Sequence, residues 1–400
     1  MAGPLAGLKV LELGTLIAGP FAARMFAEFG AEVIKVEDPQ GGDPIRNWRY
    51  LHEGTSLWLY VQARNKKSIA LNLKDPRAQE IARTLALDAD VVIENYRPGV
   101  LEKWGLGYEA LRALNPSTIM VRISGYGQSG PMRDMPGFGA IGESMGGIRY
   151  VSGHPDRPPV RIGISIGDSI AALHGVIGAL MALRHRDATG GRGRGAGQFV
   201  DVALYEAVFN MMESTVPEFD RFGVVRERTG GALPGIVPSN TYTCADGAAI
   251  VVAGNGDAIF KRLMTAMGRT DLAEDPGLAR NEGRVKRTGE IDAAIQSWCS
   301  GRSIDAALAA LKAADVPASR IYSVADMFGD PQFAARGMIE QQHLPDGTAL
   351  KVPSVVPKLS ATPGGTAWLG PALGEHTEEI LRQLGHDQTA IDTLRRDRVI

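Results

Sequence analysis

The chain has 400 residues, of which 44% are hydrophobic and 22% are charged, so it is long enough for a sizeable core and about two or three domains. Its 43 Lys and Arg residues against 45 Asp and Glu residues give a formal net charge of −2, which argues against a nucleic-acid-binding protein because such proteins usually carry a strongly basic domain or patch. The two cysteines, Cys244 and Cys299, exclude a disulfide framework and a four-cysteine zinc site, and we expect no bound metal.

Hydropathy along the chain favours a cytoplasmic protein that has neither a nucleic acid nor a membrane as a partner. The opening residues show no basic segment followed by an apolar run, so no secretory signal is expected. The most apolar segment, 170–183, is interrupted by His174 and is shorter than the roughly 20 apolar residues that cross a bilayer. A buried helix accounts for it better.

Strand and helix patterns alternate through the N-terminal half of the chain. Apolar, β-branched runs predict strands at 9–13, 32–36, 68–73, 90–94 and 118–123. The patterns between them predict helices, including one at 21–29 and one that opens at Asp75-Pro76. Such alternation is typical of βαβ units and predicts an α/β fold with a mainly parallel sheet. Binding sites in sheets of this kind lie at the carboxyl ends of the strands.

A long helix is predicted next, at 170–186. The glycine-rich stretch 190–197 follows it and is interpreted as a flexible connection. A second glycine-containing stretch, 229–235, indicates a domain boundary, beyond which the pattern to about residue 324 is that of a small α+β unit. Further strands are predicted at 199–202, 240–243, 249–253 and 350–353, and further helices at about 258–267, 304–313 and 376–384.

Ser165 is one candidate nucleophile. It lies in Gly163-Ile164-Ser165-Ile166-Gly167, which fits the G-x-S-x-G nucleophile elbow of α/β hydrolases, between a short strand pattern and a helix. Such an enzyme also needs an acid and a histidine later in the chain, and the available histidines are His343, His376 and His386. A hydrolase-like thioesterase or esterase that uses Ser165 is therefore one hypothesis.

Asp168 is a second candidate, because it begins the long apolar helix directly after Gly167. One interpretation is a simple helix N-cap, a position that aspartate favours. The other is a functional carboxylate that the helix dipole keeps ionised and that the glycine leaves open to a substrate. The residues alone leave both interpretations open.

Basic residues are frequent near the predicted strand ends of the first half. They are Lys35, Arg64, Lys66, Lys67, Arg97 and Lys103. Scattered surface charge is the simplest interpretation. The alternative is a cradle for an anionic ligand such as a phosphate, for which residues 64–67 are the best candidate.

Several blocks, in order along nearly the whole chain, resemble the class III CoA transferases. They lie at 11–21, 30–37, 64–69, 94–99, 124–131, 167–168 and 370–377, and include Glu94-Asn95-Tyr96-Arg97-Pro98-Gly99. This family includes formyl-CoA:oxalate and carnitine CoA transferases, dicarboxylate CoA transferases and α-methylacyl-CoA racemases. Ordered blocks are far more specific than any single motif.

The resemblance implies a large Rossmann-like domain and a small α+β domain, joined by long linkers, in an interlocked homodimer. On that basis we expect a Rossmann-like CoA-binding domain at 1–187 and a linker with a helix at 188–228. The small α+β domain is expected at 229–325, and a linker at 326–400 is expected to return to the large domain.

The resemblance also implies the site residues. The catalytic aspartate falls on Asp168, and the mobile loop that covers it in relatives falls on Gly230 and Gly231. The contacts to CoA fall on Leu16, Ile17, Ala18, Leu73, Lys74, Asn95, Tyr96, Lys103 and Trp104. CoA is then a cosubstrate, and no tightly bound cofactor is implied.

The implied activity is transfer of CoA from an acyl-CoA to a carboxylic acid through an aspartyl-CoA thioester. Segment 235–242 is most similar to the branch that uses succinyl-CoA and dicarboxylates. The expected partners are therefore a dicarboxylyl-CoA, small carboxylic acids and a second copy of the chain.

Three departures from the family pattern affect the expected substrates. The His-Asp pair of racemases falls on Phe138 and Gly139, so the α-methylacyl-CoA racemase alternative lacks its second acid/base. Ile17 replaces a glutamine of the formyl-CoA enzymes, which argues against oxalate. Asp38 replaces an arginine that often follows the second strand in relatives, so the nucleotide contacts are expected to differ.

Overall fold

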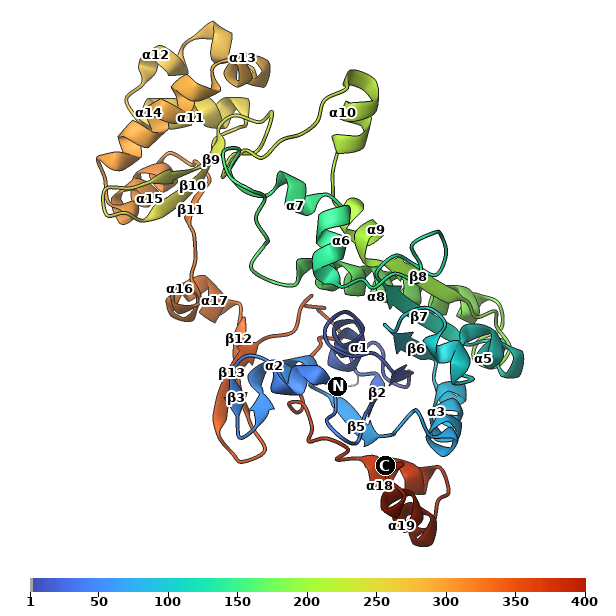
Figure 1. Ribbon diagram of the computed structural model, residues 1–400. Helices are drawn as coiled ribbons and strands as arrows, with labels where there is room; N and C mark the ends of the chain where they lie inside the picture. The colour runs from blue at the N-terminus through green and yellow to red at the C-terminus, as the bar shows by residue number, and fades with distance from the viewer. Residues whose placement is uncertain (1–2) are drawn as a thin grey trace. The chain divides into compact units, whose positions relative to one another are not determined.

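A computed structural model describes residues 3–400 (Figure 1), and contacts within the chain divide it into two compact units. The first unit comprises 3–148, Ile162–Glu213 and Gln332–Ile400. The second comprises Arg149–Arg161 and Ser214–Pro331. Each unit is therefore assembled from segments that are distant in the sequence.

This division differs from the expected domain limits in three places, one of which is the end of the second unit at Pro331 rather than at 325. Arg149–Arg161, expected in the large domain, belongs to the second unit, where the Gly230 amide donates to the Gly153 carbonyl (2.9 Å). The expected linker 188–228 divides after Glu213, so its first part belongs to the first unit. Long-range hydrogen bonds of this kind leave no trace in the local composition on which the expected limits rest.

The first unit is built on a six-stranded sheet in which every pair of neighbours is parallel. Its strands are β1 (Lys9–Glu12), β2 (Glu32–Glu37), β5 (Lys66–Ala70), β6 (Val91–Glu94), β7 (Ile119–Ser124) and β8 (Phe199–Ala203). They lie in the order β5-β2-β1-β6-β7-β8, so the chain order reverses between β1 and β6. This is the Rossmann order, in which ligands bind at the reversal. The predicted α/β fold with a large parallel sheet is confirmed.

One strand lies elsewhere than predicted: β5 spans Lys66–Ala70 rather than 68–73. Lys66 is fully buried and its ammonium group is neutralised by Glu12 of β1, so a charged residue begins this edge strand. After Ala70 the chain leaves the sheet, and the Asn72 amide donates to the Val399 carbonyl (2.8 Å).

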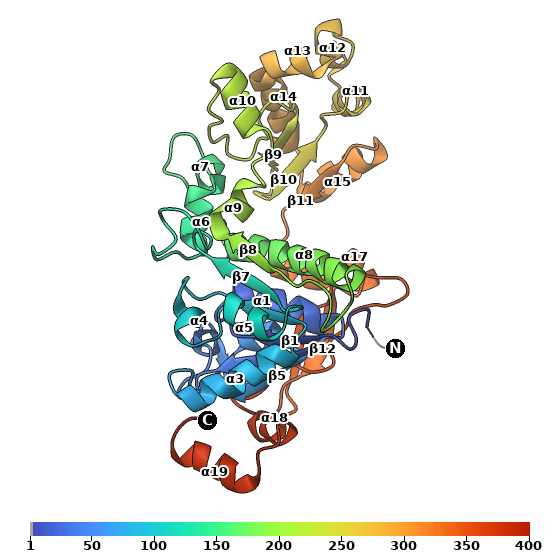
Figure 2. The same cartoon turned by 90° about the vertical axis from the view of Figure 1, so that its right-hand side faces the viewer.

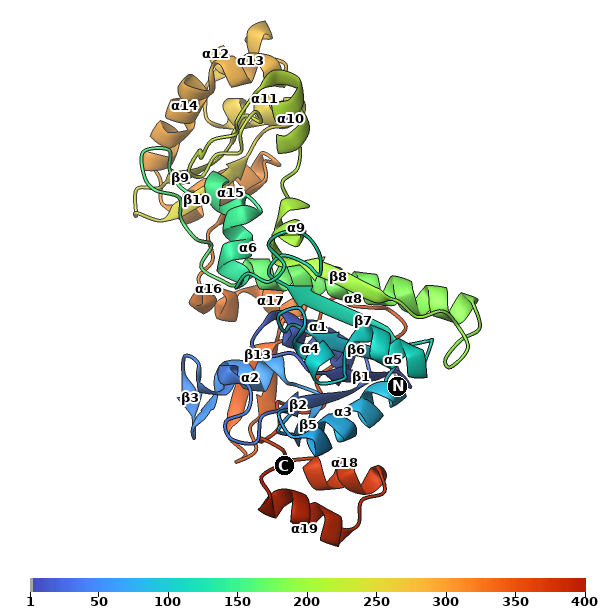
Figure 3. The same ribbon diagram turned by 45° about the vertical axis from the view of Figure 1, so that its right-hand side comes forward.

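Helices cover both faces of the sheet (Figures 2 and 3). One face packs against α1 (Ala18–Glu28) and α8 (Ile166–Ala188). The other face packs against α3, α5, α18 and α19, whose bounds are Pro76–Asp88, Tyr108–Leu114, Thr377–Gln383 and Gln388–Arg396. Alternate residues of each strand thus face two separate apolar clusters, as expected for a parallel sheet that is buried on both sides.

Helix α3 illustrates how the sequence sets a helix boundary. Its N-cap is Asp75, whose carboxylate accepts the Arg77 amide (2.8 Å), and Pro76 occupies the first helical position. Proline is tolerated there because the amide it lacks has no partner within the helix. The helix start predicted at Asp75-Pro76 is confirmed.

The shorter elements of the first unit lie around this sheet. They are η1 (Pro44–Asn47), β3 (Leu51–His52), β4 (Thr55–Ser56), α2 (Leu57–Gln62), α4 (Val100–Lys103), α6 (Gly139–Met145), α9 (Leu204–Phe209), β12 (Ile339–His343) and β13 (Ala349–Pro353). The pairs β3–β4 and β12–β13 are antiparallel hairpins.

The C-terminal segment, Gln332–Ile400, completes the first unit. The Asn65 side chain accepts the Ala367 amide (2.7 Å) and donates to the Gly365 carbonyl (2.7 Å). Further on, the Ala70 amide donates to Thr377 Oγ1 (3.0 Å). These contacts attach α18 and α19 beside the edge strand β5.

The glycine-rich stretch 190–197 is an ordered turn, so its interpretation as a flexible connection is wrong. The Gly193 amide donates to Ser117 Oγ (2.7 Å), and the Gly197 amide donates to the Pro116 carbonyl (2.8 Å). A Cβ on Gly197 would lie 2.1 Å from the Thr118 carbonyl oxygen. The glycines are needed because two backbone segments approach each other closely.

Helix α8 has 23 residues and a mean hydropathy of 1.6, which by length and composition alone would suffice to cross a membrane, and 44% of its apolar window is buried. One side of it packs on β7 and β8 through residues such as Ala172 and Val176. We therefore interpret it as a core helix, in agreement with the sequence, and the cytoplasmic location stays a prediction.

The second unit contains a three-stranded antiparallel sheet, in the order β11-β10-β9. Its strands are β9 (Ser239–Thr243), β10 (Ala249–Ala253) and β11 (Ala318–Arg320). Its helices are α10 (Thr215–Phe222), α11 (Asp257–Ala266), α12 (Thr270–Ala273), η2 (Pro276–Leu278), α13 (Asn281–Lys286), α14 (Thr288–Ser300), α15 (Ile304–Ala313) and α16 (Val324–Gly329). Two short helices, α7 (Ile148–Val151) and α17 (Pro331–Ala335), lie where the chain passes between the units. Cys244 and Cys299 are both buried in this unit's core.

Candidate active site

The loops after β1 and β6 meet at the point where the strand order reverses. Asn95, just after β6, holds the loop after β1 with two hydrogen bonds: its Oδ1 accepts the Thr15 amide (2.8 Å) and its Nδ2 donates to the Thr15 carbonyl (2.8 Å). A Cβ on Gly14 would lie 2.8 Å from Asn95 Oδ1, so the contact requires glycine. Of the predicted CoA contacts, the structure thus brings Asn95 and Tyr96 next to the loop of Leu16, Ile17 and Ala18.

Leu16 adopts a left-handed backbone conformation, with φ of 66°. A branched residue rarely adopts this conformation unless its surroundings impose it. Here the Asp43 carboxylate accepts the Leu16 amide through both oxygens, at 2.9 and 3.1 Å. Gln62 holds the next residue, because its Nε2 donates to the Ile17 carbonyl (3.0 Å). The loop is therefore fixed before any ligand binds.

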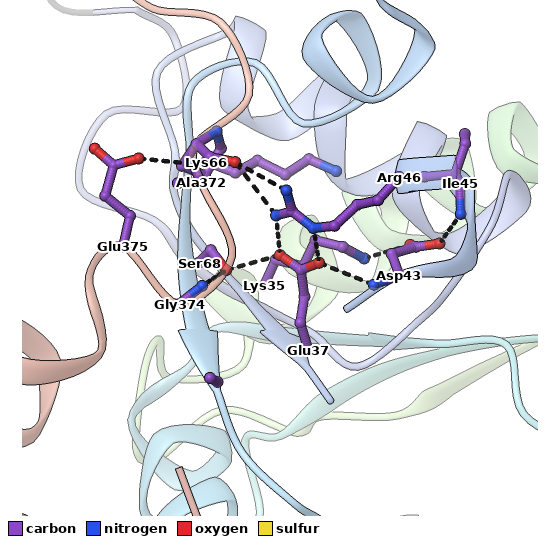
Figure 4. A network of polar contacts seen from close by, with 12 residues as sticks. Lys35, Glu37, Asp43, Ile45, Arg46, Lys66, Ser68, Ala372, Gly374 and Glu375 are labelled. Carbon is purple, nitrogen blue, oxygen red and sulfur yellow. Dashed lines mark hydrogen bonds and ion pairs between the residues drawn. The ribbon is translucent and has the colours of Figure 1, made fainter. Parts of the chain in front are cut away.

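A buried network of charges supports this loop, and Figure 4 shows the part of it around Lys35, Asp43, Glu37 and Arg46. Lys35 Nζ donates to Glu12 Oε1 (2.8 Å) and also contacts Asp43 Oδ2 (2.8 Å). Lys66 Nζ donates to the other oxygen of Glu12 (2.6 Å). Glu12 thus lies between two lysines, and the network reaches the carboxylate of Asp43 that fixes Leu16.

Three cations proposed as part of an anion cradle are therefore structural. Lys35 and Lys66 are buried against Glu12, and Arg64 is buried with its Nε 2.8 Å from Glu28 Oε1. Since charges buried in ion pairs of this kind are not available to a ligand, the phosphate-cradle hypothesis is wrong for these residues. Lys67 is partly exposed and pairs with Glu379 (2.8 Å).

The network shifts the pKa values of its members. Burial lowers the pKa of Lys66 to about 8, despite the opposing attraction of Glu12. Burial would raise the pKa of Glu37, but hydrogen bonds from Arg46 and the charge of Lys35 outweigh it and lower the pKa to about 2. Arg46 binds Glu37 with two nitrogens, each 2.7 Å from a carboxylate oxygen. Glu37 is therefore ionised at neutral pH.

The remaining predicted CoA contacts follow the carboxyl ends of two strands: Leu73 and Lys74 come after β5, and Lys103 and Trp104 come after β6. Tyr96 and Trp104 pack edge to face, with ring centroids 5.4 Å apart. Leu73 is buried, whereas the neighbouring Lys74 is partly exposed beyond the end of β5. Within the described residues, the side chains of Lys74 and Lys103 have no ion-pair partner, which leaves their charges available to a ligand.

Asp168 lies in the first turn of α8 and is half-buried. The N-cap of this helix is Ser165, so the interpretation of Asp168 as an N-cap is wrong. Within the first turn, the positive end of the helix dipole favours an ionised carboxylate.

Gly139, the first residue of α6, lies directly against the carboxylate of Asp168. A Cβ on Gly139 would lie 2.0 Å from Asp168 Oδ2 and 2.7 Å from Cγ. A Cβ on Gly167 would lie 3.0 Å from the Gly139 carbonyl oxygen, so both glycines allow the close approach of α6 to α8. Gly139 also has no side chain that could serve as the second acid/base of a racemase, which counts against that alternative.

The geometry around Ser165 does not support a hydrolase. The residues before Ser165 form no strand, whereas a nucleophile elbow requires one. Among the described residues, no hydrogen bond joins Ser165 to a histidine. His376 Nδ1 instead accepts the Ser68 amide (3.2 Å) beside β5, which lies at the opposite edge of the sheet from β8.

Gly230 and Gly231, the predicted active-site loop, lie in the second unit. Gly230 has φ of 68°, and a Cβ there would lie 2.9 Å from His154 Nδ1. Gly231 lies beside Thr241 of β9. Their role as a cover for Asp168 stays a prediction.

Sequence models of protein families provide the decisive comparison: the model of CoA-transferase family III matches residues 5–377. The chain belongs to this family. Family III membership confirms the predicted class of enzyme, an acyl-CoA:carboxylate CoA-transferase with CoA as a substrate, and the hydrolase hypothesis is set aside.

Relatives within family III cover the chain from end to end. The succinyl-CoA--D-citramalate CoA-transferase of Chloroflexus aurantiacus is 50% identical over 399 residues, which are 99% of this chain and 98% of that protein. The beta subunit of the succinyl-CoA--L-malate CoA-transferase of the same organism is 41% identical over 402 residues, with 99% and 98% covered. The crystal structure of a CAIB/BAIF family protein from Brucella suis is 35% identical, covers 96% of this chain and 100% of its own, and has a TM-score of 0.82.

Sequence reasoning missed one residue that shapes the candidate site. Asp43 fixes Leu16 and joins it to the buried charges, yet it lies in a loop between β2 and β3. The only local sign was the Asp43-Pro44 pair, which is typical of a helix start; Asp43 is indeed the N-cap of η1.

Proposed function

We propose that this enzyme transfers CoA from succinyl-CoA, or another dicarboxylyl-CoA, to a small carboxylic acid through an Asp168–CoA thioester. The position of Asp168 carries the proposal: it is a half-buried carboxylate in the first turn of a helix, closely approached by the backbone of Gly139 and preceded by Gly167. The substrate class is supported by the names of the two Chloroflexus relatives, which both use succinyl-CoA.

In the proposed cycle, the Asp168 carboxylate attacks the thioester carbonyl of the donor, giving a mixed anhydride and CoA thiolate. The thiolate then attacks the Asp168 carbonyl, which releases the donor acid and leaves the Asp168–CoA thioester. The acceptor carboxylate attacks this thioester and forms a second anhydride with release of CoA thiolate. The thiolate finally attacks the acceptor carbonyl, so the new acyl-CoA leaves and the Asp168 carboxylate is restored.

For CoA we propose the crevice at the reversal of strand order. The fixed loop of Leu16, Ile17 and Ala18 offers backbone groups, Tyr96 and Trp104 offer a partly buried aromatic surface, and Lys74 and Lys103 offer unpaired positive charge for phosphates. Burial raises the pKa of Tyr96, and Asp38 is among the nearby carboxylates that add to this effect. We propose that the cations that contact the nucleotide come from the segments that follow β5 and β6.

We also propose that the enzyme is a homodimer, the interlocked form expected from the family. The outer side of α8 carries a row of exposed apolar residues, namely Leu173, Ile177, Leu180 and Met181. Their spacing places them on one face of the helix. A second copy of the chain would remove this face from water.

Asp168→Asn tests the mechanism, because the amide has nearly the size of the carboxylate but cannot attack a thioester. We expect CoA transfer from succinyl-CoA to citramalate or malate to fall by at least about 10³-fold. Wild-type protein incubated with succinyl-CoA is expected to gain the mass of CoA in a form that hydroxylamine releases, and the variant is not.

Ser165→Ala is the matched control, since it changes a neighbouring residue of the same helix end. It is expected to retain activity and CoA labelling. Retained transfer in Asp168→Asn, or labelling of Ser165 by a fluorophosphonate, would contradict the proposal. A panel of donor thioesters and acceptor acids, with products identified by mass spectrometry, determines the substrate pair.

A further inference from the structure

Three potential metal ligands meet where two hairpins of the first unit lie side by side (Figures 1 and 3). His52 and Glu53 lie at the tip of the hairpin β3–β4, and Asp346 lies at the tip of the hairpin β12–β13. Each side chain offers one ligand atom within 4.8 Å of the other two. His52 Nε2 and Asp346 Oδ2 are 2.7 Å apart.

These separations fit a small divalent cation after modest side-chain movement. Imidazole nitrogen and carboxylate oxygen bind Zn²⁺ at about 2.0–2.2 Å, so ligand atoms around it lie roughly 3–4 Å from one another. His52 and Asp346 would separate by a few tenths of an ångström as a metal replaced the proton between them. Glu53 is exposed, so its side chain is free of packing constraints and can approach.

The ligand from the second hairpin is already oriented. Asp346 Oδ1 accepts the Thr348 amide (2.9 Å), and its Oδ2 accepts the Thr348 hydroxyl (3.0 Å). Outer contacts that orient a ligand in this way increase metal affinity. The side chains of His52 and Asp346 are 30% and 31% exposed, so a cation can reach them from solvent.

We propose that His52, Glu53 and Asp346 form a binding site for Zn²⁺ or a similar divalent transition metal, with water completing the coordination. The mixed nitrogen and oxygen donors favour such metals over Mg²⁺ and Ca²⁺, which prefer oxygen ligands alone. The site is independent of the CoA-transferase reaction and contains none of its proposed residues.

A metal at this site would fasten the returning C-terminal segment to the N-terminal part of the chain. The ligands come from residues 294 apart in sequence. The N-terminal and C-terminal segments that carry these ligands also share a small apolar cluster that contains Tyr60, Leu344 and Val352. The expected role is therefore stabilisation of the first unit.

The test uses the full-length enzyme, freed of metal with a chelator and dialysed. Co²⁺ is added as a visible probe, because imidazole and carboxylate ligands produce an absorption band that aqueous Co²⁺ lacks, and Zn²⁺ is then used to displace it. We expect a band in the wild-type protein, and a rise in the thermal midpoint with Zn²⁺ but not with Mg²⁺.

His52→Gln and Asp346→Asn are expected to weaken Co²⁺ binding by at least about tenfold, with Glu53→Gln a milder third case. His386→Gln removes a histidine from another part of the same unit and is expected to bind as the wild type does. The proposal is overturned if the wild-type protein gives no band, or if His52→Gln and Asp346→Asn bind as tightly as His386→Gln. Circular dichroism and CoA transfer confirm that each variant is folded.

Discussion

Gly139 shows how the absence of a side chain can shape the surroundings of a proposed catalytic residue. Its backbone occupies the space beside the Asp168 carboxylate, and a Cβ would fall 2.0 Å from Oδ2. The atom that would have to yield is the end of a flexible side chain rather than backbone, so the fold can accommodate a methyl group by rotating Asp168 away. A methyl group at position 139 is therefore expected to affect catalysis more than the stability of the fold.

Gly139→Ala is therefore expected to lower kcat for CoA transfer by roughly 10²-fold, because a carboxylate displaced by about 1 Å no longer meets the thioester carbonyl correctly. Its thermal midpoint is expected to change little. The control is Gly163→Ala, since a Cβ on Gly163 meets nothing within 4 Å. Steady-state kinetics with both variants check this, and an unchanged kcat in Gly139→Ala would show that the contact does not position Asp168.

Glu37 makes the stability of the first unit sensitive to acid. Its pKa is lowered from 4.5 to about 2, so it binds fewer protons when folded than when unfolded between these values. The resulting stabilisation, on the order of 3 kcal/mol, is fully present above about pH 5 and is lost as the pH falls toward 2.

Glu37→Gln is expected to be less stable than the wild type at neutral pH, and the gap in urea midpoint is expected to narrow as the pH is lowered from about 6 to about 3.5. The control is Glu109→Gln, because Glu109 is 78% exposed and its pairing with Arg112 contributes little. A gap that stays constant with pH would mean that Glu37 is not ionised in the folded protein.

At the residue scale, the sequence singled out the proposed catalytic residue but misjudged the supporting charges. Asp168 was singled out because it lies at a glycine–helix junction within a block that resembles a family, and its catalytic role stays a prediction. Lys35 and Lys66 were misjudged because their partner, Glu12, lies on another strand, 23 and 54 residues away. No local sequence pattern distinguishes a basic side chain that is available to a ligand from one that is paired with an acidic residue inside the protein.

At the scale of elements, the turn 190–197 joins α8 to β8 and fixes where the last strand enters the sheet. Its glycines permit close contact between backbone segments. Composition alone had suggested that this stretch was a flexible link. Gly197 is the tightest case, since three backbone atoms of Ser117 and Thr118 lie within 2.7 Å of the position that a Cβ would occupy.

Gly197→Ala is expected to lower the free energy of unfolding by about 1–3 kcal/mol, because backbone rather than a side chain must move to admit the methyl group. Thermal or urea unfolding measures the change. Gly163→Ala serves again as the control and is expected to leave stability unchanged. Equal stability of the two variants would show that the turn adjusts freely.

Apart from β5, the strands of the parallel sheet could be predicted within one or two residues, because buried parallel strands form continuous apolar runs. The run at 119–124 is of this kind and is entirely buried in the structure. The limits of β5 could not be predicted, since a lysine with a distant partner begins it. Helix α19 was missed because its buried residues, Ile391 and Leu394, are two among many polar ones.

At the scale of the whole molecule, the exposed apolar face of α8 leads us to expect that two copies of the chain associate. Each large apolar side chain that a partner covers contributes about 2 kcal/mol. We therefore expect light scattering to give the mass of two chains. Ile177→Glu combined with Met181→Glu is expected to abolish or destabilise that species, because it would bury two charges.

Leu114→Glu is the matched control, because Leu114 is 64% exposed at the end of α5, on a different helix from the apolar row. It is expected to keep the dimeric mass. A wild-type protein with the mass of a single chain would contradict the homodimer and leave the apolar face of α8 without an explanation.

The return of Gln332–Ile400 to the first unit has a consequence for synthesis of the protein. A ribosome delivers all six strands of the parallel sheet more than a hundred residues before it delivers α18 and α19. During that interval the nascent chain exposes the apolar surface that Ile380, Leu381 and Ile391 later cover. The second unit is translated in full before the last helices of the first unit are synthesised. Synthesis of the first unit therefore starts earlier but is completed later than that of the second unit.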